Sequence, residues 1–150
     1  MKKVPIVRVR NLNKKYRLSE SFIQRIARDM LVALKAGRVI DLDVVFLSNG
    51  AIRSFNKRYK HADRATDVLS FDLGPCAQIL ISSDAESKNS KIFDTRFEEE
   101  IVLYVIHGIL HLHGYDDGTK AEKNRMSKKE GRILKGLCGR LKFSKVLTRR

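Results

Sequence analysis

The stretch FEEEIVLYVIHGILHLHG, residues 97–114, has a strongly helical pattern of apolar side chains with histidines inside it. Gly114 predicts the end of this helix, because glycine readily adopts the backbone conformation that closes a helix. His107 and His111 stand at i and i+4, so both lie on one face of the helix, one turn apart. The stretch therefore predicts a helix that points two imidazoles toward one place.

The residues after Gly114 supply candidates for a third metal ligand. If the chain turns back at this glycine, Tyr115, Asp116 and Asp117 approach the two histidines. Two histidines, one carboxylate and an open fourth position are the arrangement of a catalytic zinc site, and they also suit iron, manganese or nickel. His113 lies about 200° round the helix from His111 and is on the wrong face. The alternative interpretation is a buried helix whose histidines only hydrogen-bond to carbonyls.

Apolar patterns elsewhere predict a mixed α+β fold. We expect helices and strands in the order βαβαββαα, which indicates an α+β sandwich with a small mixed sheet of about four strands rather than a bundle or a barrel. Residues 1–150 are expected to form one domain, since 43% of them are hydrophobic. The last residues, KFSKVLTRR at 142–150, are expected to be a basic tail without fixed structure. The predicted strands are 4–10, 39–47, 67–73 and 78–82, and the predicted helices run from Ser19 to Gly37, from Ser48 to Tyr59, from about 83, from 97 to 113 and from about Thr119.

The charge is large and uneven along the chain. Lys and Arg outnumber Asp and Glu by 31 to 17, for a net charge of +14. Residues 1–60 and 120–150 carry 15 and 12 basic side chains against 4 and 2 acidic ones, whereas residues 61–119 carry 4 basic and 11 acidic. Basic flanks favour a polyanion such as RNA as the partner, with a solvated basic surface as the alternative. No apolar run reaches the about 18 residues of a membrane helix, and we expect a cytoplasmic protein.

Two blocks of the sequence resemble the YbeY family of bacterial endoribonucleases and rRNA maturation factors. The family's motif H-G-x-L-H-L-x-G-Y-D-H is matched by residues 107–116 at each specified position. A second motif, N-x-x-Y-R-x-x-D-x-P-T-D-V-L-S-F, resembles NKRYKHADRATDVLSF at residues 56–71. Met126 and Glu130 also suit the family's final helix. The resemblance extends from about Asp41 to Leu137.

The resemblance implies a fold and an activity. The expected fold is a zincin-like α/β/α sandwich with the metal-site helix at its centre. The expected activity is metal-dependent cleavage of single-stranded RNA in rRNA maturation and ribosome quality control. The implied cofactor is one Zn²⁺ per chain, with another divalent transition metal as the alternative. The implied partners are rRNA and the ribosomal subunit or ribosome-associated proteins.

The resemblance also assigns roles to individual residues. His107 and His111 are the expected first two metal ligands, and Asp117 stands where the family has its third, with Asp116 behind it. Lys60 stands at the family's arginine and is the expected catalytic cation, which would stabilise charge on the reacting phosphate. Arg58 and Arg64, in the same block, are expected to bind RNA. No aromatic-rich RNA-recognition motif is present, so we expect the choice among RNAs to come from the shape of the cleft or from partner proteins.

Departures from the motifs leave a second hypothesis open. Aspartate at 117 replaces a neutral histidine by an anion, which we expect to make a bound ion a weaker Lewis acid. Lysine at 60 lacks the planar two-pronged contact that arginine makes to phosphate. The chain is then either an endoribonuclease or a basic ribosome-associated assembly factor with a structural metal. A hydrolase of a smaller substrate fits the charge less well, and a zinc peptidase is disfavoured because Gly108 stands where HExxH peptidases have their glutamate.

Overall fold

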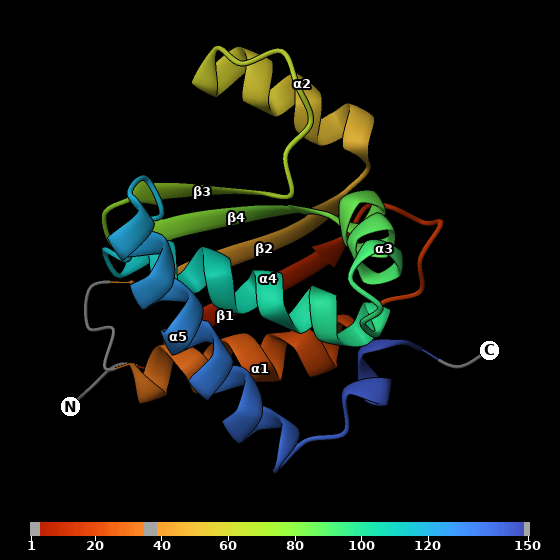
Figure 1. Cartoon of the computed structure of the whole chain (residues 1–150), viewed down its shortest axis with the longest axis vertical. Helices are drawn as coiled ribbons and strands as arrows, with labels where there is room; N and C mark the ends of the chain where they lie inside the picture. Colours follow the sequence, from red (N-terminus) through yellow and green to blue (C-terminus); the bar gives the residue numbers. More distant parts are fainter. Residues whose placement is uncertain (1–3, 35–38, 149–150) are drawn as a thin grey trace.

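The computed structural model describes residues 4–34 and 39–148, and a four-stranded sheet runs through its middle (Figure 1). The order of the strands is β1-β2-β4-β3. Strands β1 and β4 both run parallel to β2, while β3 runs antiparallel to β4. This confirms the predicted mixed sheet, and it leaves β3 at one edge. The strands are β1 (Ile6–Asn11), β2 (Asp41–Leu47), β3 (Val68–Leu73) and β4 (Cys76–Ser82).

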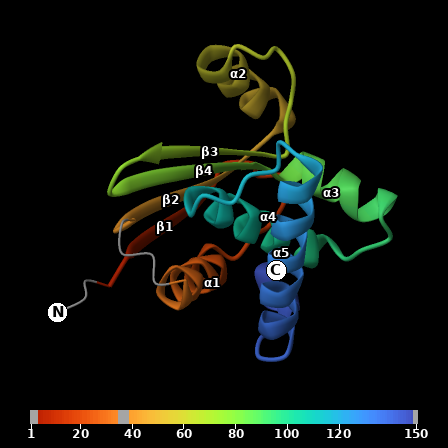
Figure 2. The same ribbon diagram turned by 60° about the vertical axis from the view of Figure 1, so that its left-hand side comes forward.

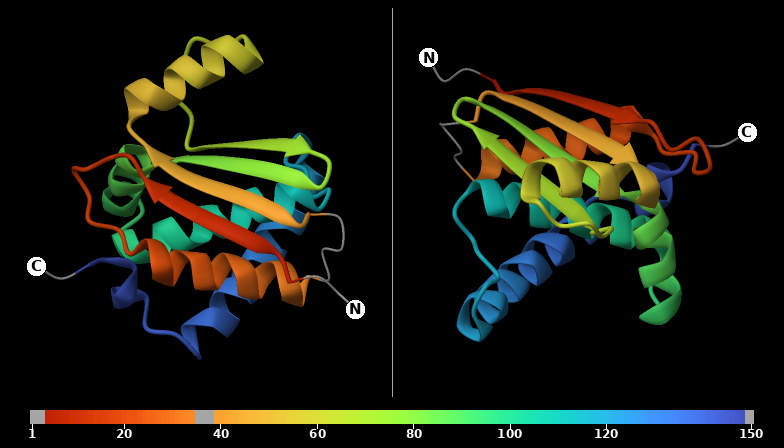
Figure 3. Two further views of the ribbon diagram at one scale, coloured as in Figure 1. Left: turned by 180° about the vertical axis from the view of Figure 1, so that it is seen from behind. Right: turned by 90° about the horizontal axis from the view of Figure 1, so that it is seen from above.

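Helices cover both faces of the sheet. Helices α1 and α4 lie side by side on one face, α5 packs against the outer side of α4, and α2 stands over the opposite face (Figures 2 and 3). Helix α4 also contacts α3, β3 and β4, which confirms the central position expected for the metal-site helix. The helices are α1 (Glu20–Ala33), α2 (Asn49–Lys60), α3 (Ser83–Ile92), α4 (Phe97–Leu112) and α5 (Lys120–Cys138).

Alternation along the strands builds an apolar cluster on each face of the sheet. In β2, Val44 and Phe46 join the larger cluster under α1 and α4, whereas Val45 and Leu47 join a smaller one under α2. Ile52 is the α2 side chain buried in the smaller cluster. The second face is therefore covered mainly through one helix, and α2 has much of its own surface left in solvent.

Side-chain caps explain where the helices begin. The hydroxyl oxygens of Ser19, Ser48, Ser82 and Thr119 each accept a backbone N–H from the first turn of the helix that follows. This confirms the predicted starts at Ser19, Ser48 and Thr119. Gly37, which we expected to end the first helix, lies outside the described residues. No helix in the described ranges combines the length and the apolar character needed to cross a bilayer.

The prediction of an unstructured tail from about residue 142 is wrong for residues 143–148. Residues Phe143–Val146 form a 3₁₀ helix, and the side chains of Phe143 and Val146 are buried in the larger cluster. The backbone N–H of Ser19 donates to the Val146 carbonyl at 2.6 Å, and that of Thr148 donates to the Arg17 carbonyl at 2.9 Å. Two apolar side chains on one side of a short turn anchor this segment despite its basic neighbours.

Helix α4 approaches β4 closely at Gly108. A Cβ atom added to this glycine would lie 2.7 Å from Cγ2 of Ile79 and 3.0 Å from its Cδ1. Ile79 is fully buried in β4, so its branched side chain has no free space to move into. The backbone of α4 can lie this close to β4 only because residue 108 has no side chain.

We therefore expect Gly108→Ala to destabilise the fold. Overpacking costs about 1–3 kcal/mol, and the better helix propensity of alanine returns about 1 kcal/mol, so the net loss is at most about 2 kcal/mol. Gly136→Ala is the matched control, because Gly136 lies in α5 with nothing within 4 Å of an added Cβ, and it should gain up to about 1 kcal/mol. Urea unfolding measures both. A Gly108→Ala variant as stable as Gly136→Ala would contradict the close approach.

Candidate metal centre

Helix α4 brings the two predicted histidines together. The Nε2 atoms of His107 and His111 lie 3.1 Å apart, and the ring centroids lie 4.6 Å apart with the ring planes at 78°. Both side chains are partly buried, at 19% and 25% exposed, so each ring packs against the protein and also reaches solvent. The two nitrogens therefore converge on one point at the surface of the helix.

The chain reversal after α4 brings in the third ligand. Gly114 has φ +85°, its N–H donates to the His111 carbonyl at 3.1 Å, and the N–H of Tyr115 donates to the Leu110 carbonyl at 3.1 Å. These two bonds are the Schellman closure of a helix, which redirects the chain across its own last turn. Asp117 consequently lies beside the imidazoles, with Oδ2 3.7 Å from Nε2 of both His107 and His111.

These three side chains fit a tetrahedral divalent ion. Ligand atoms about 2.1 Å from a tetrahedral zinc lie about 3.4 Å from one another, and the observed edges are 3.1, 3.7 and 3.7 Å. Among the described residues, this is the one group of at least three His, Cys, Asp or Glu side chains with ligand atoms close enough to hold a metal. Asp117 is 47% exposed, so the centre opens to solvent on that side. The chain thus has a candidate metal site with room for a fourth ligand.

Glu130 of α5 supports the first histidine. Its Oε1 lies 2.5 Å from Nδ1 of His107, and its side chain is only 14% exposed. When Nε2 of His107 acts as a ligand, Nδ1 carries the proton and donates to Glu130. A carboxylate in this position holds the ring in the ligating orientation and makes Nε2 a stronger donor to a metal.

The sequence prediction assigned no role to Glu130, although a signal for one was present. Met126 and Glu130 stand at i and i+4 in α5, and Met126 is buried against the core. A carboxylate one turn from a buried methionine lies toward the inner side of the helix, where an unpaired charge is costly. The sequence did not show that His107 lies opposite Glu130, because this contact depends on how α5 crosses α4.

A network that includes Tyr104 links the surroundings of His107 to Asp67, the residue before β3. The Tyr104 ring lies 5.9 Å from the His107 ring, and its hydroxyl donates to Oδ2 of Asp67 at 3.0 Å. Asn89 Nδ2 also donates to Asp67 Oδ2, at 3.3 Å. Burial and the nearby carboxylates hold the pKa of Tyr104 far above its ordinary value, so its hydroxyl stays protonated and acts as a donor.

Glu86 of α3 is a buried carboxyl in this region, and it lacks a partner like the one that Glu130 has in His107. It is fully buried, and neither oxygen has a hydrogen-bond partner in the described structure. Burial, followed by the negative charges of Asp67 and Glu100, raises the pKa of Glu86 to about 10. The group is therefore neutral in the folded protein at pH 7.

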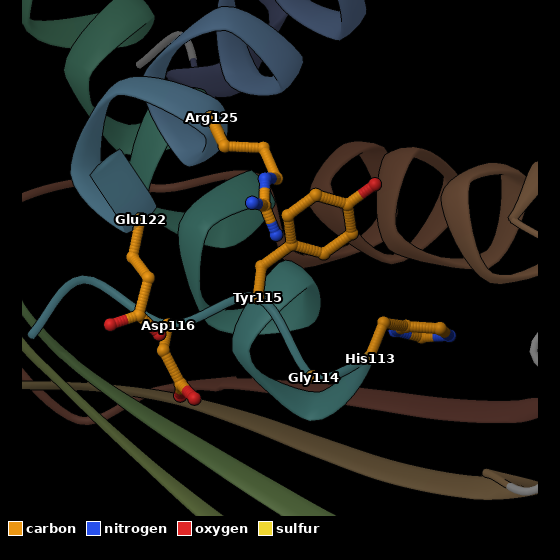
Figure 4. Close-up of a pocket in the computed structure, with 6 residues that line it drawn as sticks. All are labelled: His113, Gly114, Tyr115, Asp116, Glu122 and Arg125. Carbon is orange, nitrogen blue, oxygen red and sulfur yellow. The ribbon is translucent and has the colours of Figure 1, made fainter. Parts of the chain in front are cut away.

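His113 and Asp116 lie outside the metal centre. His113 Nδ1 lies 2.8 Å from the Ile109 carbonyl, which confirms that this histidine is on the wrong face for a ligand. Figure 4 shows Asp116 and Glu122 on one side of a pocket and Tyr115 and Arg125 on another. This pocket has a volume of about 220 Å³, and none of the three ligands is among the residues that line it. The structure therefore brings Asp117, and not Asp116, to the two histidines.

The predicted RNA-binding cations lie across the sheet from the metal centre. Lys60 is the last residue of α2, and its Nζ lies 5.2 Å from the centre of the Phe71 ring. Arg58 precedes it in α2, and its guanidinium carbon lies 5.6 Å from the centre of the Tyr59 ring. Arg64 lies in the loop that follows, where its carbonyl accepts from Asn56 Nδ2 at 2.9 Å. The catalytic role of Lys60 stays a prediction.

Comparisons with known proteins agree on one family. A family model described as Endoribonuclease YbeY matches residues 8–138. A protein described as Endoribonuclease YbeY from Salinibacter ruber is 36% identical over 62% of this chain and 68% of its own length. One from Clostridium botulinum is 31% identical over 87% of this chain and 96% of its own. The solution structure of TM1509 from Thermotoga maritima superposes with a TM-score of 0.65 at 26% identity, covering 89% of this chain and 90% of that one.

We expect about one divalent ion per chain in the native protein. His107→Ala and Asp117→Ala should each lose it, because each removes one of three ligands. Glu130→Gln should keep the site but bind about 10–100-fold more weakly, since His107 then lacks its carboxylate. Elemental mass spectrometry of untagged protein measures the metal content, and zinc titrations of the stripped protein measure the affinity. His113→Ala is the matched control for loss of an imidazole from the same helix end, and metal loss in that variant would contradict the assignment.

Glu86→Gln should stabilise the protein at neutral pH. The folded pKa of Glu86 lies above its unfolded value, so the unfolded state releases a proton that the folded state keeps, and wild-type stability falls as pH rises from about 4.5 toward 10. Glutamine removes this penalty, which is on the order of 3 kcal/mol at pH 7. Urea unfolding at pH 5 and pH 8 should show a variant advantage that grows with pH. A constant difference would show that Glu86 ionises normally.

Proposed function

The chain belongs to the YbeY endoribonuclease family, and we propose on that premise that it is a metal-dependent endoribonuclease. Its proposed substrate is single-stranded RNA, and its proposed place is rRNA maturation and ribosome quality control. Family membership implies RNA as the substrate class. The net charge of +14 supports it, because a basic surface gains affinity for a polyanion through counterion release.

The observation that carries the proposal is the meeting of His107, His111 and Asp117 at one point. Two imidazoles and one carboxylate, with an open side, are suited to Zn²⁺, which we propose as the bound ion. A divalent ion held there would supply Lewis acidity toward a phosphoryl oxygen or a water molecule. Asp117 and Glu130 together place two carboxylates at the centre, and these offset the charge of a dication.

The chain's own residues prepare this chemistry. Glu130 accepts the proton of His107 Nδ1 and thereby holds Nε2 toward the centre. We propose that Lys60 binds a substrate phosphate and stabilises its developing charge, and that Arg58 and Arg64 bind neighbouring phosphates of the same strand. All three side chains belong to α2 and the loop that follows it, and all three are exposed. They form one cationic approach for RNA.

A second candidate function rests on the same residues. Asp117 and Lys60 stand where the family motifs have histidine and arginine. An anionic ligand weakens the Lewis acidity of the ion, and lysine makes a less directional phosphate contact. These two changes favour a basic factor that joins the ribosomal subunit in the cytoplasm and holds its metal for structure.

Cleavage assays separate the two candidates. With an end-labelled single-stranded RNA and zinc present, we expect the wild-type protein to cut and His111→Ala to lose activity by about 100-fold or more, since removal of a ligand dismantles the centre. The same RNA in duplex form should be cut more slowly. His113→Ala should retain wild-type activity, which controls for changes at the end of α4.

Restoring the family residues distinguishes a nuclease from an assembly factor. Asp117→His combined with Lys60→Arg should raise turnover if the chain is a nuclease, because both changes strengthen charge stabilisation at the reacting phosphate. An assembly factor with a structural ion would show altered zinc affinity and no gain in cleavage. Absence of cleavage in both proteins, with zinc bound at one ion per chain, would overturn the nuclease proposal.

A further inference from the structure

Three aromatic rings gather on the surface between α2 and β3. Phe55 and Tyr59 stand at i and i+4 in α2, with ring centroids 6.0 Å apart and ring planes at 19°. Tyr59 meets Phe71 of β3 edge-on, with centroids 5.9 Å apart. Tyr59 is 52% exposed and Phe55 is 37% exposed, so the rings are open to solvent. These three residues, which we name the aromatic platform, come from segments separated by the loop 61–67.

Packing of the core accounts for only one of these rings. Phe71 is partly buried against the smaller apolar cluster, where it covers Leu69 and its neighbours. In α2, however, the buried residues are Ile52 and Asn56, and Phe55 and Tyr59 are not among them. Keeping two large aromatic side chains in water forgoes about 1–2 kcal/mol each relative to burial. Their exposure therefore points to a surface that is covered by a ligand.

Cations surround the aromatic platform. Arg58 lies over the Tyr59 ring and Lys60 over the Phe71 ring, at 5.6 and 5.2 Å from the ring centroids. Helix α2 carries four basic side chains and no acidic one. Asp63, the first carboxylate after α2, is held by Arg53 at 2.8 Å and by Lys57 at 3.9 Å, so its charge is already compensated. The ligand that fits is an anion with flat aromatic groups.

We propose that the aromatic platform, together with Arg58 and Lys60, binds single-stranded RNA by stacking on its unpaired bases. This proposal rests on the proposed function and names how the same chain would select its substrate. Aromatic rings and guanidinium planes stack bases of any sequence, while cations beside them bind the phosphates. A duplex cannot use this surface, because its base faces are already stacked on each other. The platform would thus impose a preference for single strands.

Strand β3 connects the platform to the metal centre. Phe71 faces α2, whereas the preceding residue, Ser70, faces the other way and donates its hydroxyl proton to the Gly108 carbonyl at 3.3 Å. Gly108 directly follows the ligand His107 in α4. Because β3 is an edge strand, no further strand stands between the two faces at this point. Figure 2 shows α2 above this edge and α4 below it. A strand of RNA held on the platform can pass over the edge toward the ligands.

The experiment separates base contacts from phosphate contacts. Fluorescence anisotropy measures the binding of two end-labelled ligands, a single-stranded RNA and an abasic chain of equal length and charge. Both are titrated with metal-stripped protein in the presence of chelator, at one salt concentration. Wild-type protein should bind the RNA about tenfold or more tightly than the abasic chain, since one stacked base contributes about that much. Tyr59→Leu and Phe55→Leu should bind the RNA with an affinity close to that for the abasic chain.

Controls are available within the chain. Tyr59→Phe keeps the ring and should bind like the wild type. Phe93→Leu removes a 64% exposed phenylalanine from the end of α3, outside the platform, and should also bind normally. Binding of the abasic chain should be unchanged in the two leucine variants. Circular dichroism and urea unfolding of each variant report whether the fold is intact. We expect an intact fold, because Phe55 and Tyr59 are exposed positions on α2.

Each outcome bears on one claim. Loss of base-dependent affinity in Tyr59→Leu and Phe55→Leu supports the platform, even if the nuclease assays show no cleavage. Equal binding of RNA and the abasic chain by the wild type, or equal RNA binding by wild type and leucine variants, overturns the platform even if cleavage is observed. If either of these results is found, the exposed rings would have a different role, such as contact with a protein.

Discussion

The close approach of α4 to β4 at Gly108 is the constraint on which the rest of the structure depends. The helix backbone lies so near Ile79 that a single Cβ would have to displace a fully buried side chain. This approach puts one side of α4 against the sheet and leaves His107 and His111 on its accessible side. Helix α5 then crosses beside them and supplies Glu130, and Ser70 of the edge strand reaches the Gly108 carbonyl. A helix held farther out would lose both contacts.

Two carboxyl groups near this region, Glu130 and Glu86, have different surroundings. Glu130 faces an imidazole nitrogen, so its negative charge has a partner and orients a ligand. Glu86 is buried beside other carboxyls and has no hydrogen-bond partner, so burial first and the neighbouring negative charges second raise its pKa to about 10, and the group is neutral at pH 7. The same residue type thus serves the metal centre in one place and carries a pH-dependent cost in stability in the other, because local partners differ.

The edge strand β3 joins two surfaces with different chemistry. One side of it bears Phe71, the aromatic rings of α2 and the cations beside them. The other side is bonded to the metal-site helix through Ser70. Stacking, phosphate binding and a reactive centre are three separate needs of a nuclease that acts on single strands, and a sheet edge lets one chain of RNA meet all three. Lys60, which we propose to bind a substrate phosphate, lies on the platform side of this edge.

By itself the sequence determined the features that arise from neighbouring residues. The sequence indicated the mixed sheet, most helix starts, the i and i+4 histidines and the reversal at Gly114, because each depends on local periodicity or backbone preference. The choice of Asp117 among the residues after Gly114 came from the resemblance to the family, and the structure brings that residue to the histidines. Only the tertiary structure decided which distant side chains meet. Glu130 reaches His107, Phe71 joins Phe55 and Tyr59, and Phe143 and Val146 anchor a segment that its basic composition predicted to be loose. These contacts follow from how helices cross and pack, and that geometry is set by the whole core and not by any single segment.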